Sequence, residues 1–198
     1  MANPNVGMMY PVFAPITTHT DGSMPTYGPG VVIQEARNCT ISKTYNSNPL
    51  YGDDRIVDDD NGLQELTASF ESTGLSDSDR KLLFGEEEIS VGGITCQVES
   101  DNETPYGGFG YIRRMRDNGE RRFEAWIILK IKFQEESQTT TTKEGSISWN
   151  TPTLSGRAAG LYIDSTDKLR FRVHETFDTI AAAKSWLNTV LNVPSATT

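Results

Sequence analysis

The residue types that most often carry catalysis are sparse in this chain of 198 residues. It has two histidines, His19 and His174, and no sequence pattern joins them. General acid–base catalysis needs such a side chain beside a reacting group, but His174 lies in a strand-like segment typical of a structural histidine. No glycine–serine–glycine nucleophile elbow occurs either. The sequence therefore predicts a protein that is not an enzyme.

Two acidic runs, Asp53–Asp54 and Asp58–Asp60, have the chemistry to hold a cation. The segment "DDDNG" resembles part of a calcium-binding loop, which needs glycine at its sixth position and glutamate at its twelfth. With Gly62 as that glycine, Val57 falls at the first ligand position and Ala68 at the closing one. This spacing rejects an EF-hand and leaves at most weak cation binding, and no Cys/His spacing fits zinc. We expect no metal site and no cofactor.

Two local clusters have a structural interpretation. Three glycines, Gly107, Gly108 and Gly110, precede a strand-like segment, so they do not match a dinucleotide-binding loop, which a helix follows. We expect them where another part of the backbone comes close. Five arginines form the one basic concentration, without the interleaved aromatic residues of a nucleic-acid site: Arg113, Arg114, Arg116, Arg121 and Arg122. We interpret them as a solvated hairpin tip, or as ion-pair partners of an acidic neighbouring subunit.

Composition limits the function classes further. The formal net charge of -9 disfavours binding to a phosphate backbone, which depends on Lys and Arg. Cys39 and Cys96 are expected to be reduced, buried thiols of a protein made in a cytoplasm. No stretch approaches the roughly 18 apolar residues that span a bilayer, and the N-terminal segment lacks the pattern of a secretory signal. We expect no membrane insertion.

The elements that must position any site are mostly strands. Alternation predicts strands within 30–43, 62–73, 106–133, 145–156 and 168–175, and capping patterns predict helices at 75–85 and 177–192. The expected fold is mainly β (α+β): a β-sandwich or partial barrel of antiparallel strands with a flanking short helix and a C-terminal helix. Length is compatible with one large domain.

Three of these elements carry detailed predictions. In 62–73, Leu66, Ala68 and Phe70 alternate with polar residues and should face a core. In 106–133, Asn118-Gly119 supplies the tight turn of a hairpin, and one apolar face of its second arm comprises Phe123, Ala125, Ile127, Leu129, Ile131 and Phe133. Ser76 should cap the first helix, with Asp79 three residues on and Gly85 past its end, and Thr176 or Asp178 should cap the second.

One long connection, 44–62, shows no regular period. Loops of this length inside a compact domain are usually functional or disordered. Its apolar residues argue against disorder: Tyr45, Leu50, Tyr51, Ile56 and Val57. Two interpretations remain open, insertion into a partner and a flap folded back on its own domain.

The order of these features resembles a known family. "PLYGDD", "GLQELTASFESTGLSDSDRKLLFG", "PYGGFGYIRRMRDNGERRFEAWIILKIKF" and "ESQTTTTKEGSISWNTPTLSGRAAG" together resemble the major tail protein, or tail tube subunit, of long non-contractile-tailed bacteriophages (siphophages). The resemblance covers about residues 30–192. It divides the chain into an N-terminal arm (1–29), a tail-tube β domain with the long loop 44–62 (30–192) and a C-terminal tail (193–198).

The resemblance implies a structural virion protein, made in the cytoplasm of a bacterial host and located in the viral tail. Such subunits assemble as homohexameric rings that stack helically into a hollow tube, through which the genome is ejected during host cell entry. The implied partners are further copies of the chain, a tape-measure protein, and tail terminator and distal tail proteins. Double-stranded DNA would pass through without specific binding.

Candidate site residues follow from this resemblance. Loop 44–62 becomes the inter-subunit stacking element, with Tyr45, Leu50 and Tyr51 as apolar anchors and Asp53, Asp54 and Arg55 as polar partners. A negatively charged channel wall would repel DNA and let it slide. The candidate acidic residues of the lumen are Asp58, Asp59, Asp60, Glu65 and Glu71.

Two alternatives remain. The chain could be a monomeric β-sandwich module that binds a carbohydrate or another surface, with Trp126, Trp149 and Tyr106 as a sugar platform. A hydrolase is the weakest interpretation, because a paired-carboxylate mechanism needs two acids across a cleft and no pair is singled out.

Overall fold

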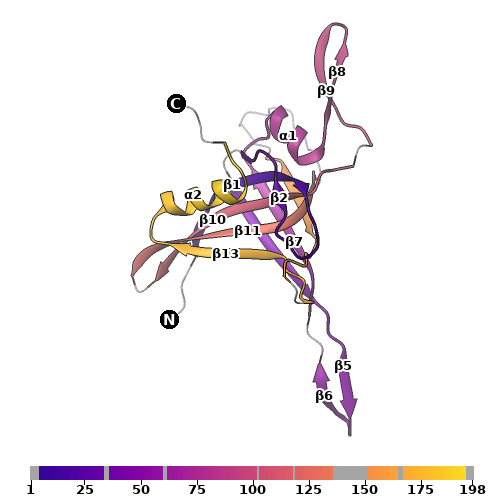
Figure 1. The fold of residues 1–198 in the computed structure, drawn as a ribbon, viewed down its shortest axis with the longest axis vertical. Coiled ribbons are helices and arrows are strands. Elements are labelled where there is room, and N and C mark those ends of the chain that lie inside the picture. Colours follow the sequence, from indigo (N-terminus) through magenta and orange to yellow (C-terminus); the bar gives the residue numbers. More distant parts are fainter. Residues whose placement is uncertain are drawn as a thin grey trace, which may run out of the picture.

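The computed structural model describes residues 5–33, 36–59, 62–101, 103–117, 119–135, 151–164 and 167–194. A β body carries two hairpin arms that project from opposite ends of its longest axis (Figure 1). Within the described residues, nine strands form one antiparallel sheet in the order β2-β1-β10-β11-β12-β7-β4, with β3 paired to β1 and β13 to β11. The expected mainly-β fold with two short helices is confirmed.

The strands of this sheet have the following bounds: β1 Asn5–Thr18, β2 Thr26–Tyr27, β3 Val31–Val32, β4 Ala36–Tyr45, β7 Leu63–Ser72, β10 Gly107–Asp117, β11 Glu120–Glu135, β12 Thr153–Ala158 and β13 Arg172–Phe177. The sheet curls until its last strand, β4, comes close to β1. No strand pairing joins β1 to β4 in the described ranges. The body is therefore a partial barrel with an open seam between β1 and β4 (the β1–β4 seam).

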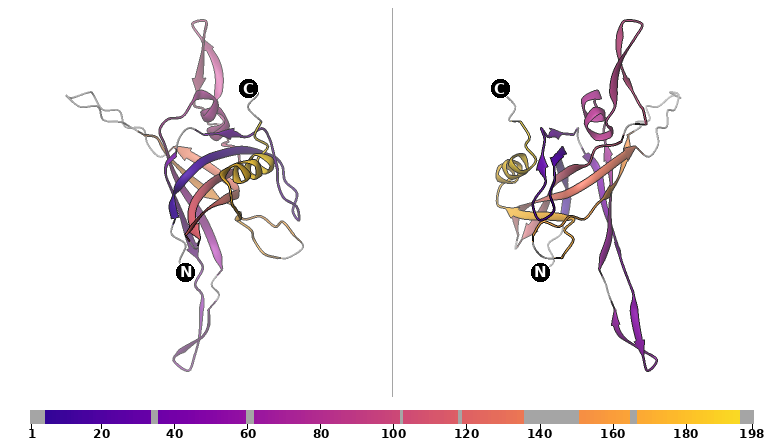
Figure 2. Two further views of the ribbon diagram at one scale, coloured as in Figure 1. Left: turned by 90° about the vertical axis from the view of Figure 1, so that its left-hand side faces the viewer. Right: turned by 45° about the vertical axis from the view of Figure 1, so that its right-hand side comes forward.

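Two apolar clusters stabilise the body. The barrel core lies inside the curled sheet, where four fully buried rings, Phe13, Phe70, Phe109 and Phe133, pack edge to face. The helix core lies on the outer side, where Ala183, Leu187 and Leu191 cover β10 and β11. Figure 2 shows the C-terminal helix lying across that outer face. Both faces of β10 and β11 are thus buried, as their apolar sequences require.

The expected hairpin at 106–133 is present, with Asp117 paired to Glu120 across the turn and Gly119 at φ 90°. The prediction that one apolar face runs along the whole second strand of this hairpin is wrong. Ala125, Ile127 and Leu129 belong to the helix core, whereas Ile131 and Phe133 belong to the barrel core. The cause is a β-bulge.

In this bulge, the step from Gly107 to Phe109 advances two positions along β10, whereas the step between their partners, Ile131 and Ile128, covers three positions of β11. One extra residue reverses the alternation beyond it. At the same point the other edge of β11 changes partner, from β13 (through Ile128) to β12 (from Ile131). The bulge therefore lets one long strand belong to both walls of the barrel.

The two helices follow their capping residues. α1 (Asp77–Phe84) has Ser76 as N-cap in a capping box with Asp79, and Gly85 in the left-handed conformation at its end, as predicted. α2 (Ile180–Val190) begins after Thr179, whose side chain accepts a hydrogen bond from the Ala182 N–H. The predicted caps Thr176 and Asp178 are wrong, because β13 continues to Phe177 and delays the start of the helix.

The N-terminal segment needs the largest correction. Residues 1–29 were set apart as an arm, but β1 pairs with β10 over most of its length, and Val12, Phe13 and Ala14 are fully buried. The predicted strand at 30–43 is also divided into β3 and β4. Of the C-terminal tail, Val193 packs against the helix core, and residues 195–198 lie outside the described residues.

The glycine patch lies at close packing, as expected. A β-carbon at Gly108 would collide with Tyr27 and Leu191, and one at Gly110 would meet Leu191 and Leu187. A β-carbon at Gly107 would meet the Phe13 ring and, as expected, another part of the backbone, the carbonyl oxygen of Ala14, whereas the neighbours of Gly108 and Gly110 are mainly side chains of β2 and of the C-terminal helix and its cap. These glycines therefore let the C-terminal helix approach the sheet.

Candidate assembly site

The segment 44–62 is a β-hairpin rather than an irregular loop. Tyr45 ends β4, and the Asn46 N–H donates a hydrogen bond of 2.8 Å to the Gly62 carbonyl oxygen, which closes the base of the hairpin. β5 (Pro49–Gly52) and β6 (Arg55–Asp59) then pair with each other and with no other described strand. We name this hairpin the β5–β6 arm. It extends away from the body and does not fold back on it (Figure 1).

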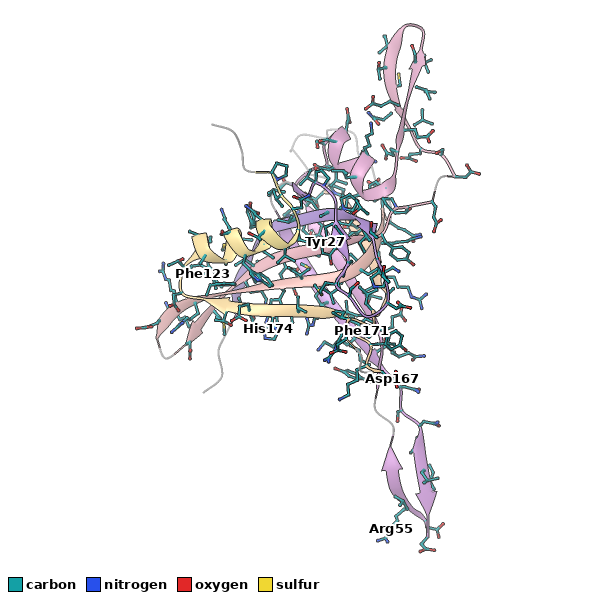
Figure 3. The ribbon with its side chains drawn as sticks, in the orientation of Figure 1. Tyr27, Arg55, Phe123, Asp167, Phe171 and His174 are labelled. Carbon is teal, nitrogen blue, oxygen red and sulfur yellow. The ribbon has the colours of Figure 1, made fainter. Side chains whose placement is uncertain are left out.

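The predicted stacking residues all lie at or on this arm. The side chains of Leu50, Tyr51, Ile56 and Val57 are 57–67% exposed, and Tyr45 at its base is 53% exposed. Asp53 and Asp54 form the turn at its tip, and Arg55 lies at the far end of the arm in Figure 3. Large apolar side chains exposed in a group mark an interaction surface.

A second arm was not anticipated from the sequence. β8 (Glu87–Val91) and β9 (Ile94–Val98) form a hairpin beyond α1 that pairs with no other described strand, and we name it the β8–β9 arm. Ile89, Val91 and Ile94 on it are 45–69% exposed. The sequence signal was there: Gly92-Gly93 separates two short runs rich in β-branched residues, as in a two-residue hairpin.

Isolated two-stranded hairpins are at best marginally stable in water. Neither arm contributes a residue to the barrel core or the helix core. Each arm instead presents large apolar side chains to solvent, where they are not stabilised by burial. The arms therefore have the properties of strands that are completed by a partner.

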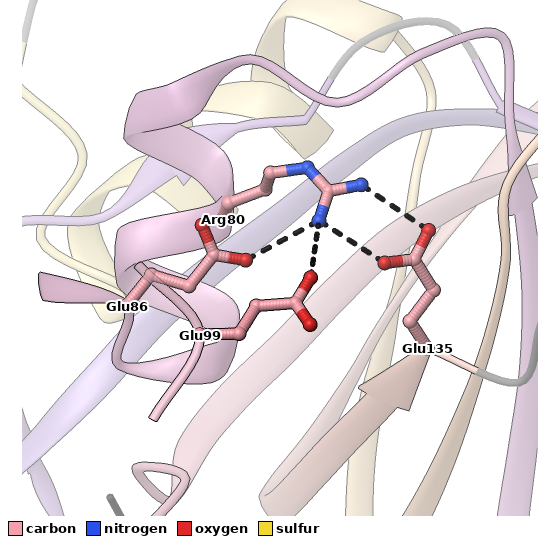
Figure 4. Close-up of polar contacts among 4 residues, drawn as sticks. All are labelled: Arg80, Glu86, Glu99 and Glu135. Carbon is pink, nitrogen blue, oxygen red and sulfur yellow. Dashed lines mark hydrogen bonds and ion pairs between the residues drawn. The ribbon is translucent and has the colours of Figure 1, made fainter. Parts of the chain in front are cut away.

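One arginine fixes the base of the β8–β9 arm (Figure 4). Arg80 on α1 forms a bidentate pair with Glu135 at the end of β11, with N–O distances of 3.1 and 3.2 Å. It also contacts Glu86 at 3.2 Å, just before β8, and Glu99 at 3.9 Å, just after β9. The guanidinium thereby joins the two ends of the arm to the helix and the sheet.

The predicted acidic residues of the lumen are not one group. Glu65 pairs with Arg157 at 2.6 Å, and Glu71 with Arg37 at 2.9 Å, so both charges on β7 are locally compensated. Asp58 and Asp59 belong to β6 of the β5–β6 arm. Asp60 lies outside the described residues. No three of the described Cys, His, Asp and Glu residues lie close enough together to hold a metal ion.

The arginine cluster is partly paired within the chain. Arg113 donates to Glu124 at 2.5 Å, and Arg122 pairs with Asp178. Burial is the largest single influence and raises the pKa of Glu124, but the Arg113 guanidinium together with the Trp126 and His174 side chains leaves this pKa below its ordinary value. Beside them His174 stacks on Trp126 at 4.1 Å between ring centroids. His174 thus has the strand-face position that the sequence predicted (Figure 3).

The proposed sugar platform does not form from its described members. Trp126 is 8% exposed, and its ring is covered by Arg172 and His174. Tyr106 carries Lys132 and Lys130 over its ring, at 4.3 and 4.6 Å. A sugar stacks on an open aromatic face, which the covered ring of Trp126 does not offer. Trp149 lies outside the described residues.

The two cysteines are free and only partly buried. Burial raises the pKa of the Cys39 thiol to about 12. Such a thiol is not a nucleophile at neutral pH.

The structure shows a mainly β body with two short helices and two projecting hairpin arms whose apolar side chains are exposed. Comparison with models of known protein families and with curated proteins finds no match to this chain in either set. None of the helices described is both long and apolar enough to cross a membrane. The exposed surfaces of the β5–β6 and β8–β9 arms are therefore the features that bear on function.

Proposed function

We propose that this chain is a structural subunit that assembles with copies of itself. The observation that carries the proposal is the pair of arms: two hairpins with exposed apolar side chains, at opposite ends of the longest axis of one molecule (Figure 1). A subunit with a contact surface at each end can join copies head to tail, and such contacts build rings or filaments.

Within this class we propose the tail tube subunit of a siphophage. The resemblance of residues 30–192 to the tail tube family supports this assignment. The partial barrel and the flanking helices support it as well. So does the β5–β6 arm, which lies where the resemblance implies a stacking loop. In the proposed assembly, hexameric rings stack through the arms into a tube in the virion tail. Strands from six subunits would join into one continuous inner barrel around a channel for tape-measure protein and then DNA, with terminator and distal tail proteins at the two ends.

The charge of the channel belongs to the same proposal. Glu65 and Glu71 are poor candidates for the lumen wall because arginines already compensate them. A wall that repels DNA would therefore depend on the overall charge of -9 and on the acidic β5–β6 arm.

The test is assembly of the purified protein, followed by light scattering and negative-stain microscopy over a range of concentrations. We expect rings or tubes. A double variant, Leu50→Ser with Tyr51→Ser, should remain folded, because both side chains are exposed, and should lose assembly. The matched control is Met24→Ser with Tyr162→Ser, which removes two exposed apolar side chains outside the arms and should assemble normally.

Two outcomes would contradict the proposal. One is a protein that remains monomeric at every concentration, and a monomer that binds glycans would favour the carbohydrate-binding alternative. The other is an arm variant that assembles as well as the control.

A further inference from the structure

A cationic pocket lies at the β1–β4 seam. It has a volume of about 430 Å³ and is lined by residues of β1, β4, β10 and β13. Four of its lining residues are basic, and no described acidic residue lines it: Arg37, Lys43, Arg113 and Arg172. We name it the seam pocket. In a chain with a net charge of -9, such a grouping of positive charge indicates an anionic occupant.

The charges of the seam pocket are only partly satisfied. Arg37 pairs with Glu71, and Arg113 pairs with Glu124. Arg172 lies over the Trp126 ring at 4.0 Å, and no ion pair of Arg172 or Lys43 is found among the described residues. Lys43 and Arg172 can therefore pair with an anionic ligand. The Trp126 indole fixes the position of the Arg172 side chain.

The β5–β6 arm carries a matching anion. Asp53 and Asp54 both have left-handed backbone, with φ of 50° and 58°, at the two central positions of the turn. The tip of the β8–β9 arm has the same conformation, with φ of 61° and 82°, but there the residues are Gly92 and Gly93. Glycine adopts this backbone without strain, whereas aspartate does so at a cost.

The turn of the β8–β9 arm therefore has glycines, which suit left-handed backbone best, whereas the turn of the β5–β6 arm has two aspartates. Strained backbone of this kind concentrates where a side chain has a function. Both aspartates are exposed, and their arm projects away from the body of its own chain (Figure 1). The carboxylates are thus presented to another molecule.

We propose that the seam pocket of one copy binds the Asp53–Asp54 turn of a second copy. This inference rests on the proposed self-assembly and names the two surfaces that meet. The occupant is a second copy because this chain itself supplies paired carboxylates on a projecting arm. Lys43 and Arg172 supply the two positive charges that face them.

The test uses the assembled full-length protein and a carbodiimide, which joins a carboxylate to an amine without a spacer. Equal amounts of ¹⁵N-labelled and unlabelled protein are mixed before assembly, so that mass spectrometry separates links between copies from links within one. We expect a link from Lys43 to Asp53 or Asp54 that joins labelled to unlabelled peptides. Lys43→Arg keeps the charge but lacks the amine, and should assemble without this link.

A second measurement removes the charge. Asparagine tolerates left-handed backbone at least as well as aspartate, so Asp53→Asn with Asp54→Asn should keep the hairpin and raise the concentration required for assembly about tenfold or more. Lys43→Glu should also raise the concentration required for assembly.

The outcomes separate the two proposals. Normal assembly of both the asparagine variant and Lys43→Glu, or a Lys43 link found only within single copies, would overturn this inference while the self-assembly proposal stands. Failure of the wild-type protein to assemble at all would overturn both.

Discussion

Glu124 shows how a single buried charge is kept in this protein. It is 8% exposed on β11, between Arg113 and His174. An unpaired carboxylate at such a position would be costly, and the hydrogen bonds from Arg113 remove that cost. The result is a pKa below the ordinary value of 4.5.

The depressed pKa predicts a pH dependence. The stabilisation by the Glu124 carboxylate is present above its unfolded pKa and is lost as pH falls through the lower folded pKa. Glu124→Gln should therefore lower the free energy of unfolding by about 1.5–3 kcal/mol at pH 7. The difference between variant and wild type should narrow below about pH 4, as measured by urea unfolding at several pH values. A difference that stays constant with pH would contradict this account.

At the scale of elements, Arg80 determines how firmly the β8–β9 arm is attached. Its four carboxylate oxygen contacts come from residues at the end of β11 and on both sides of the arm. Glu86 is nearly buried, so removal of the guanidinium would leave its charge without a partner.

Arg80→Met keeps most of the aliphatic stem and removes the charge. We expect a loss of about 2–4 kcal/mol in the free energy of unfolding, because breaking a buried pair strands the remaining carboxylates. Amides of residues 87–98 should also exchange faster with deuterium. Lys81→Met on the same helix is the matched control: Lys81 and Glu88 are exposed, so the loss of their ion pair should change stability much less than Arg80→Met does. Equal effects of the two substitutions would refute the anchoring role.

The elements also differ in how far the sequence predicted them. The cap of α1, the alternation of Leu66, Ala68 and Phe70, and the hairpin at 106–133 depend on residues close together in the chain, and all are confirmed. β1 was misassigned because its partner β10 lies about a hundred residues away. No local pattern reveals that pairing.

The bulge in β11 was missed for a different physical reason. Both faces of that strand are apolar, so the sequence looks equally regular with or without an extra residue between Ile128 and Ile131. The β5–β6 arm was missed as a hairpin because its turn is Asp-Asp rather than the glycine-containing pair that usually marks such turns. Its apolar residues, from which the sequence predicts an ordered segment, are exposed in the structure.

At the scale of the whole molecule, the packing of the body does not depend on the arms. Every residue of the two cores belongs to the body, and the hydrogen bond between Asn46 and Gly62 already brings the two ends of the β5–β6 arm together.

Replacement of residues 47–61 by Asn-Gly should therefore give a folded protein. Its free energy of unfolding should lie within about 1 kcal/mol of the wild-type value, since no described side chain of the deleted segment belongs to either core. Size-exclusion chromatography with light scattering should show a monomer at concentrations where the full chain assembles. A variant that cannot fold would show that the arm supports the body, and one that still assembles would remove the arm from the interface.

The two arms differ in sequence and leave the body from opposite ends, so copies joined head to tail leave one arm unused at each end of a stack. In the proposed assembly, each copy that binds to a free end of the stack presents an identical free end of its own. Growth would then have no built-in stopping point, and the final length would have to be measured by a molecule other than this one.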